Sequence, residues 1–272
     1  MTRGAINKFV WLTLIAGLAL GLACNESVSP AVKLATTTSA ANTGLLDHLL
    51  PEFEKDTGIR VDYIATGTGK ALMHGRNGDV DVVLVHAPMA EQAFVREGYG
   101  VKRVPVMWND FVILGPPDDP AVLSQSETAA DALVKVSQAA APFVSRGDDS
   151  GTHKKELGLW EQAAVEPGGG WYIEAGQGMG ACLTMANNMQ AYILTDRGTY
   201  LARVDQLELD VVFEGDPLLV NPYAIVMVNS EKHPHVNQAG AKQLVEWITS
   251  PRGRTLIENY RVNGHLLFHL FE

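Results

Sequence analysis

The feature that most constrains the fold of this chain is a regular alternation of short apolar segments with longer segments of helical periodicity. Such alternation favours an α/β fold with a mainly parallel sheet and helices on both faces, because parallel strands need long crossover connections. The first half of the pattern predicts strands at 32–35, 59–65, 80–87 and 102–107 and helices at 42–55, 69–75 and 89–97.

A second block repeats the pattern after residue 108. It predicts strands at 142–145, 171–175, 190–194 and 210–213, helices at 129–140, 152–164, 180–188 and 196–204, and two C-terminal helices at 236–249 and 252–260. Two extended apolar segments, 109–115 and 221–228, lead into and out of this block. They fit either two crossover strands at a hinge or two further core strands.

The length of 272 residues suits two lobes. The expected division is a signal peptide at 1–23, a linker at 24–30, a first lobe at 31–108 plus 226–272, and a second lobe at 109–225.

The N-terminus carries an export signal. Arg3 and Lys8 precede an apolar run at 9–23, which is shorter than the roughly 20 residues of a membrane span. A signal peptide is the better interpretation, so we expect a periplasmic or extracytoplasmic protein. Cys24 either becomes a lipidated first residue or follows ordinary cleavage after Ala23. The other cysteine, Cys182, lies in an apolar helical run, and we expect a buried thiol and no disulfide.

The net charge excludes one class of ligand. It is −10, and loss of the signal peptide removes two positive charges, Arg3 and Lys8, giving −12. The sequence shows no basic face for nucleic acid, and any site for an anion has to be built locally.

Three loops have one design, in which hydroxyl-bearing residues and glycines lie between a strand and a helix. They are 35–39 (ATTTS), 65–70 (ATGTGK) and 145–152 (SRGDDSGT). The first N–H groups of a helix have no intrahelical partner, and the helix dipole there favours negative charge. Each loop alone is explained by ordinary helix capping. Three together, one containing Arg146, predict a site for a tetrahedral oxyanion between two lobes.

The chemistry of the anion stays open at this point. A dianion without protons needs only donors, whereas phosphate keeps a proton at neutral pH and benefits from a carboxylate acceptor. Asp148 or Asp149 could be that acceptor, or could cap the following helix and orient Arg146. An anion that does not titrate predicts an affinity nearly constant between roughly pH 6 and 8.

An enzyme or a metal site has little support. Gly67–Lys70 lacks the spacing of a phosphate-binding loop, since Ile64 and Ala71 stand where that motif needs glycine and a hydroxyl residue. Ser150 is one position too late for a nucleophile elbow. We expect no catalytic residues, no cofactor and no metal cation.

The same loops carry a family resemblance. The chain resembles the tungstate-binding proteins of ABC importers, the TupA family of periplasmic binding proteins, over roughly residues 31 to 230. The matching runs include ATTTS at 35–39, GTGKAL at 67–72, GRNGDVDVVLVHAP at 75–88, VSRGDDSGTHKKE at 144–156 and GQGMGA at 176–181.

The resemblance implies a two-lobed type II periplasmic-binding-protein fold with two hinge crossover strands. It also implies capture of tungstate, or of molybdate, for an ABC importer permease and its ATPase. The protein would be a monomer whose only attachment to the membrane is a lipid at Cys24. The alternatives are a binding protein for phosphate or sulfate and an envelope ligand sensor. The oxyanion contacts implied by the matching loops are Thr37, Thr38, Ser39, Thr68, Arg146, Ser150, Gly151 and Thr152.

Overall fold

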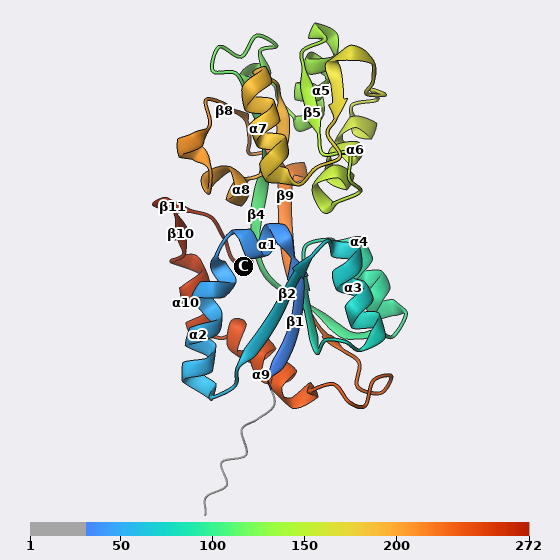
Figure 1. The fold of residues 1–272 in the computed structure, drawn as a ribbon, viewed down its shortest axis with the longest axis vertical. Helices are drawn as coiled ribbons and strands as arrows, with labels where there is room; N and C mark the ends of the chain where they lie inside the picture. The colour runs from blue at the N-terminus through green and yellow to red at the C-terminus, as the bar shows by residue number, and fades with distance from the viewer. Residues whose placement is uncertain (1–30, 272) are drawn as a thin grey trace, which may run out of the picture.

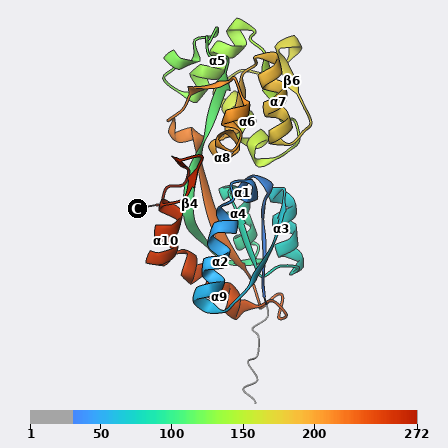
Figure 2. The same ribbon diagram turned by 60° about the vertical axis from the view of Figure 1, so that its left-hand side comes forward.

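The computed structural model describes residues 31–271, so the predicted signal peptide, the linker and Cys24 lie outside the described residues. The described chain forms two lobes stacked along the long axis of the molecule (Figure 1). The strands β4 (Gly100–Gly115) and β9 (Val220–Val228) run side by side from one lobe to the other. Figure 2 shows β4 continuing between the lobes in a second view.

The first lobe is built on the strand order β2-β1-β3-β9. The strands β1 (Val32–Thr37), β2 (Val61–Thr66) and β3 (Val82–Val85) are parallel, and β9 pairs with β3 in antiparallel register. The parallel strands therefore end at the same edge of the sheet, next to the second lobe. The helices of this lobe are α1 (Thr38–Asn42), α2 (Leu45–Thr57), α3 (Thr68–Asn77), α4 (Pro88–Arg96), α9 (Gln238–Ile248) and α10 (Pro251–Glu258).

The second lobe combines antiparallel and parallel pairs. The strands β7 (Ile193–Asp196) and β8 (Asp210–Phe213) pair with the distal half of β4 in antiparallel register, and β5 (Phe143–Ser145) pairs with β6 (Tyr172–Glu174) in parallel. Its helices are α5 (Ala129–Ala139), α6 (Gly151–Gln162), α7 (Met179–Met189) and α8 (Arg197–Leu201).

The strand β4 corrects one prediction. The expected strand 102–107 and the expected connector 109–115 are halves of one 16-residue strand. Its first half pairs with β9, and its second half pairs with β7 and β8. The two interpretations of segment 109–115 therefore both hold, because β4 is a core strand of each lobe and also the crossover between them.

The loop after β1 corrects a second prediction. The expected helix at 42–55 corresponds to α2, and a break separates α2 from the five-residue α1, a helix that was not expected. The break is at Gly44, whose φ of 76° is a left-handed conformation that glycine adopts without strain. The helix start that follows loop 35–39 is thus that of α1.

Each lobe has its own apolar core. On α2, Leu45, Leu46, Leu49 and Phe53 are buried at helical spacing and face the sheet of the first lobe. In the second lobe Cys182 is buried in a cluster with strand residues of β4 and β7, as its apolar run predicts.

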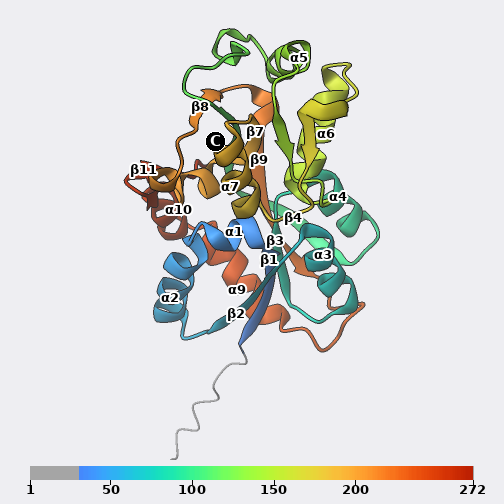
Figure 3. The same cartoon turned by 45° about the horizontal axis from the view of Figure 1, so that its top comes forward.

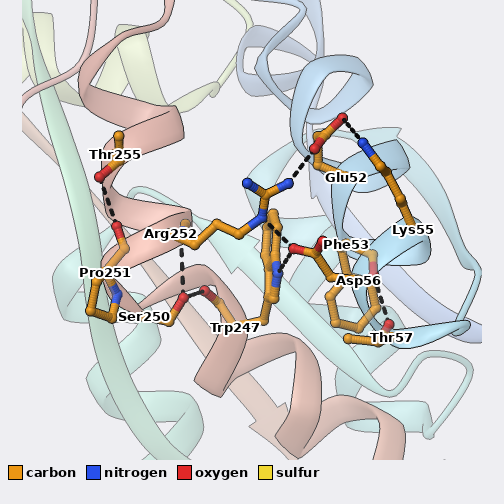
Figure 4. Close-up of polar contacts among 11 residues, drawn as sticks. Glu52, Phe53, Lys55, Asp56, Thr57, Trp247, Ser250, Pro251, Arg252 and Thr255 are labelled. Carbon is orange, nitrogen blue, oxygen red and sulfur yellow. Dashed lines mark hydrogen bonds and ion pairs between the residues drawn. The ribbon is translucent and has the colours of Figure 1, made fainter.

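The C-terminal helices are fastened to α2 by polar contacts (Figure 4). Asp56 accepts a hydrogen bond of 2.9 Å from Nε1 of Trp247, and Arg252 pairs with Asp56 and with Glu52. The ring of Phe53 packs edge-on against Trp247 with centroids 5.5 Å apart. These contacts hold the C-terminal helices against α2 of the first lobe.

The final residues also belong to the fold. The strands β10 (Arg261–Val262) and β11 (His265–Leu266) form a small hairpin. Trp108 and His269 then exchange two backbone hydrogen bonds of 2.8 Å, which joins the tail to β4. Within residues 31–271, no helix is both long and apolar enough to cross a membrane.

Candidate functional site

A cavity of about 390 Å³ lies between the lobes at the carboxyl ends of β1, β2, β3 and β5. Ligands of open α/β sheets bind at this end of the strands. All eight residues expected to contact an oxyanion line this cavity, and they are Thr37, Thr38, Ser39, Thr68, Arg146, Ser150, Gly151 and Thr152.

The loop after β1 contributes three hydroxyl groups. Thr37 is the N-cap of α1, and its Oγ1 accepts a hydrogen bond of 3.1 Å from the Ala40 amide. Oγ of Ser39 lies 3.2 Å from Oγ1 of Thr37. Capping uses a lone pair of the hydroxyl oxygen and leaves its proton available for donation. Capping and anion binding are therefore compatible at Thr37.

The loop after β2 offers backbone donors. Gly67 is the N-cap of α3 and has no side chain to satisfy the amides of the first turn. Those amides have no intrahelical partner, and the cavity wall contains Thr68, Gly69 and Lys70 at this helix start. Lys70 adds a positive charge that was not among the predicted contacts.

The loop after β5 supplies the guanidinium. Arg146 is 12% exposed and forms an ion pair with Asp148. Oδ1 of Asp148 also accepts a hydrogen bond of 3.2 Å from the Ser150 amide. Burial alone would raise the pKa of Asp148, but the hydrogen bonds from Ser150 and Arg146 outweigh it and hold that pKa below its ordinary value. Of the two roles considered for Asp148, the geometry agrees with orientation of Arg146.

The other members of this loop have structural contacts. Ser150 caps α6 by accepting a hydrogen bond of 3.2 Å from the His153 amide. Nδ1 of His153 accepts a hydrogen bond of 3.1 Å from the Asp149 amide. Asp149 is exposed and pairs with Lys154 at 3.1 Å. Ser150 and His153 are thus engaged in capping and do not form a nucleophile–base pair.

His86 is the site residue that sequence reasoning missed. It follows β3 directly, lines the cavity, and is 9% exposed. Its Nε2 lies 3.1 Å from Oγ1 of Thr37 and 3.2 Å from Oγ of Ser39. The available signal was its position, because the loop after β3 ends at the same sheet edge as the loops after β1 and β2.

His86 is held from behind by the crossover strands. Its Nδ1 lies 2.8 Å from Oδ1 of Asn221 on β9, and Nδ2 of Asn221 donates a hydrogen bond of 2.8 Å to Oδ1 of Asn109 on β4. The His86 ring stacks on Tyr223 with centroids 4.7 Å apart. Burial lowers the pKa of His86 and outweighs the opposing hydrogen bond from Asn221.

A second cavity of about 290 Å³ adjoins the first. It shares Thr38, Ser39 and Arg146 with the first cavity and is closed by the start of α7, residues 178–181. In Figure 3, α7 lies next to α1, and α6 lies next to α4. Arg146 therefore lies between two helix starts of the second lobe and the β1 loop of the first.

The wall of the first cavity is suited to an anion. It combines hydroxyl groups, amides at helix starts and the cations Arg146 and Lys70, all of which donate hydrogen bonds. In the described part of the chain, no group of three or more His, Cys, Asp or Glu side chains could hold a metal ion.

Comparison with known proteins identifies the family. The profile of the PBP superfamily domain matches residues 25–252. The tungstate-binding protein TupA of Peptoclostridium acidaminophilum is 50% identical over 229 residues, which cover 84% of this chain and 80% of that protein. This chain belongs to the TupA family. The resemblance of the loop motifs is thereby confirmed.

Solved structures agree with the TupA assignment. The crystal structure of the tungstate ABC transporter from Geobacter sulfurreducens is 52% identical, with a TM-score of 0.78, and the match covers 85% of this chain and 98% of that one. The tungstate-binding protein TupA from Desulfovibrio alaskensis G20 is 45% identical, with a TM-score of 0.82 and coverage of 89% and 99%. The two-lobed α/β fold predicted from the sequence is the fold of this family.

Proposed function

We propose that this protein is an extracytoplasmic binding protein that captures tungstate between its lobes for an ABC importer. One observation carries the proposal: Thr37 of the first lobe and Arg146 of the second line the same cavity. The TupA relatives, which are tungstate-binding proteins, support the identity of the anion.

In this proposal each wall of the cavity donates to the oxyanion. The hydroxyls of Thr37, Thr38 and Ser39 donate from the first lobe, together with Thr68. Arg146 donates charge-assisted hydrogen bonds, and Ser150, Gly151 and Thr152 add donors from the start of α6. Charge-assisted hydrogen bonds contribute roughly 1.5–3 kcal/mol each, so a few of them suffice for tight binding after the cost of association.

The state of Asp148 favours an anion without protons. Its carboxylate is already engaged by Arg146 and by the Ser150 amide, and its pKa is held low. A protonated anion such as phosphate would need a carboxylate acceptor, and the other carboxylate of this wall, Asp149, is paired with Lys154 at 3.1 Å. Tungstate, molybdate and sulfate need donors alone, and tungstate is the one bound by the named relatives.

Capture also involves the whole molecule. We propose that residues 31–108 with 226–272, and residues 109–225, close on the ligand as lobes about β4 and β9. The closed monomer would deliver the anion to a permease driven by an ATPase, without catalysis of its own. Export would follow the N-terminal signal, with or without a lipid at Cys24.

The proposal is tested by calorimetric titration of the purified mature chain with tungstate, molybdate, sulfate and phosphate. Of the four anions, tungstate should bind most tightly, or as tightly as molybdate. Preference for phosphate, or no binding of any of the four, would refute the assignment. X-ray scattering with and without tungstate tests closure, which predicts a smaller radius of gyration in the presence of the anion.

A further inference from the structure

His86 connects the anion cavity to the crossover strands. One ring nitrogen faces the hydroxyls of Thr37 and Ser39, and the other faces the Asn221 side chain. Asn221 in turn contacts Asn109 across β4 and β9. These residues form a continuous chain of hydrogen bonds from the wall of the site to the two strands that join the lobes.

The hydrogen bonds of Asn221 give the direction of donation along this chain. Nδ2 of Asn221 donates to Oδ1 of Asn109 and to the Tyr223 hydroxyl, so the amide oxygen of Asn221 faces His86. An oxygen can only accept, and Nδ1 of His86 therefore carries a hydrogen. In a neutral imidazole the other nitrogen, Nε2, is then an acceptor.

This direction has a consequence for the hydroxyls. When Nε2 is an acceptor, the hydroxyl of Thr37 or of Ser39 points its proton at His86 and cannot donate it to a ligand. An oxyanion dianion accepts hydrogen bonds and donates none. The neutral ring therefore removes one donor from the β1 wall of the cavity.

We propose that His86 is the positioning residue of the anion site, and that it takes up a proton at Nε2 when a dianion binds, which turns the hydroxyls of both Thr37 and Ser39 towards the ligand. The proton comes from solvent and bonds to Nε2, and no other covalent bond changes. The imidazolium then donates to a hydroxyl oxygen and adds a positive charge beside the anion. This inference rests on the proposed function, since it needs an oxyanion in the cavity.

The charged groups around His86 act on the protonated ring in both directions. Arg146 disfavours the protonated ring, and buried Asp196 favours it. Lys70, Asp148 and Asp149 line the same cavity, and Asp148 is paired with Arg146. Lys154 and Lys155 of α6 line a neighbouring cavity that His86 also lines. The ring of Tyr223 on β9 stacks on one face of the imidazole.

The direction of the pH dependence of binding follows from the pKa of His86 without and with the anion. Without ligand, burial holds the pKa of His86 below its ordinary value and keeps the ring neutral. A dianion beside the ring raises that pKa. Between the two values binding takes up a proton, so affinity increases as the pH falls, by at most about tenfold per pH unit. This replaces the flat profile expected from the anion alone.

The test is calorimetry of the full mature chain with dilute sodium tungstate, between roughly pH 6.5 and 9. Each pH is measured in two buffers that differ in heat of ionisation, which counts protons taken up on binding. The wild-type chain should take up a fraction of one proton and bind more tightly at lower pH. In His86→Gln, an amide N–H takes the place of Nε2–H without titrating, so binding should persist with no proton uptake and a flat profile.

His265→Gln is the matched control, because His265 is exposed in β11 and outside the cavity; it should keep the wild-type profile. Tungstate binding with no proton uptake, or an unchanged pH slope in His86→Gln, would overturn the inference and leave the proposed function intact. Absence of binding of all four anions at every pH would overturn both. If His86→Gln does not fold, the proton count of the wild-type chain still decides.

Discussion

Asn109 and Asn221 lie opposite each other on β4 and β9 and are joined by a side-chain hydrogen bond of 2.8 Å. Both are buried, and both lie where β4 changes its pairing from β9 to β7, between the two lobes. The pair therefore couples the crossover strands to each other, and through His86 it couples them to the wall of the cavity.

Removal of Asn221 should destabilise the protein. Asn221→Ala leaves Nδ1 of His86 and Oδ1 of Asn109 without these partners in a buried environment, which costs roughly 1–3 kcal/mol. Urea denaturation measures the loss. Asn77→Ala, on the surface of α3, should change the free energy of unfolding by less than about 0.5 kcal/mol. Equal stability of the two variants would contradict the role of the buried pair.

Removal of Arg146 should weaken oxyanion binding. Arg146→Ala deletes the guanidinium at the cavity wall and leaves Asp148 unpaired beside the anion, at a cost of about 2–5 kcal/mol in binding free energy. Tungstate calorimetry is the measurement. Arg60→Ala breaks an exposed ion pair with Asp62 far from the cavity and serves as the control. An unchanged tungstate affinity in Arg146→Ala would show that Arg146 does not contact the ligand.

Gly147 should tolerate no side chain. Its φ is +58°, and a Cβ there would lie 2.9 Å from Cβ and 3.3 Å from Cα of Glu174. Gly147→Ala should therefore destabilise the protein by about 1 kcal/mol or more and displace the neighbouring Arg146, lowering tungstate affinity as well. Gly158→Ala, in the helix α6 with open space around it, should instead stabilise by up to about 1 kcal/mol. Thermal unfolding of both variants gives the comparison.

The sequence predicted the cavity wall because its chemistry is local. Loops 35–39, 65–70 and 145–152 each place donors directly after a strand, and parallel strands end at one sheet edge. The α/β class and most helix positions follow from periodicity in the same way. Ser150 and Thr37 are caps, as their residue types suggest, and capping did not exclude them from the cavity.

The parts that were missed depend on contacts distant in sequence. His86 was included in an apolar strand at 80–87, and its partner Asn221 is 135 residues away. The sequence predicts two segments in place of β4 because the polar residues Asn109 and Asp110 interrupt its apolar pattern. The tail joins β4 through backbone atoms of Trp108 and His269, which no side-chain pattern reveals.

The ion pair between Glu91 and Arg103 gives a prediction with a pH dependence. Oε1 of Glu91 accepts from the amide of Ala87, next to His86, and Oε2 accepts from Arg103 at 2.6 Å. Burial raises the pKa of Glu91, against the hydrogen bonds from Ala87 and Arg103.

Arg103→Met removes one of those opposing contacts and leaves a buried carboxylate without its cation. The loss should be about 3–5 kcal/mol at about pH 8. The loss should shrink as the pH falls towards about 5, because removal of Arg103 raises the pKa of the buried carboxyl further and lets it lose its charge more readily than in the wild type. Urea denaturation of the wild type and of Arg103→Met at both pH values shows whether the loss of stability shrinks as the pH falls. A deficit that grows as the pH falls would contradict it.

The most direct measurement is the position of tungsten in a crystal of the mature chain grown with tungstate, located by anomalous scattering. We expect a single strong peak between the lobes, with tungstate oxygens within about 3 Å of both Thr37 Oγ1 and the Arg146 guanidinium. A peak outside this cavity, or contacts to one lobe alone in a closed molecule, would contradict it.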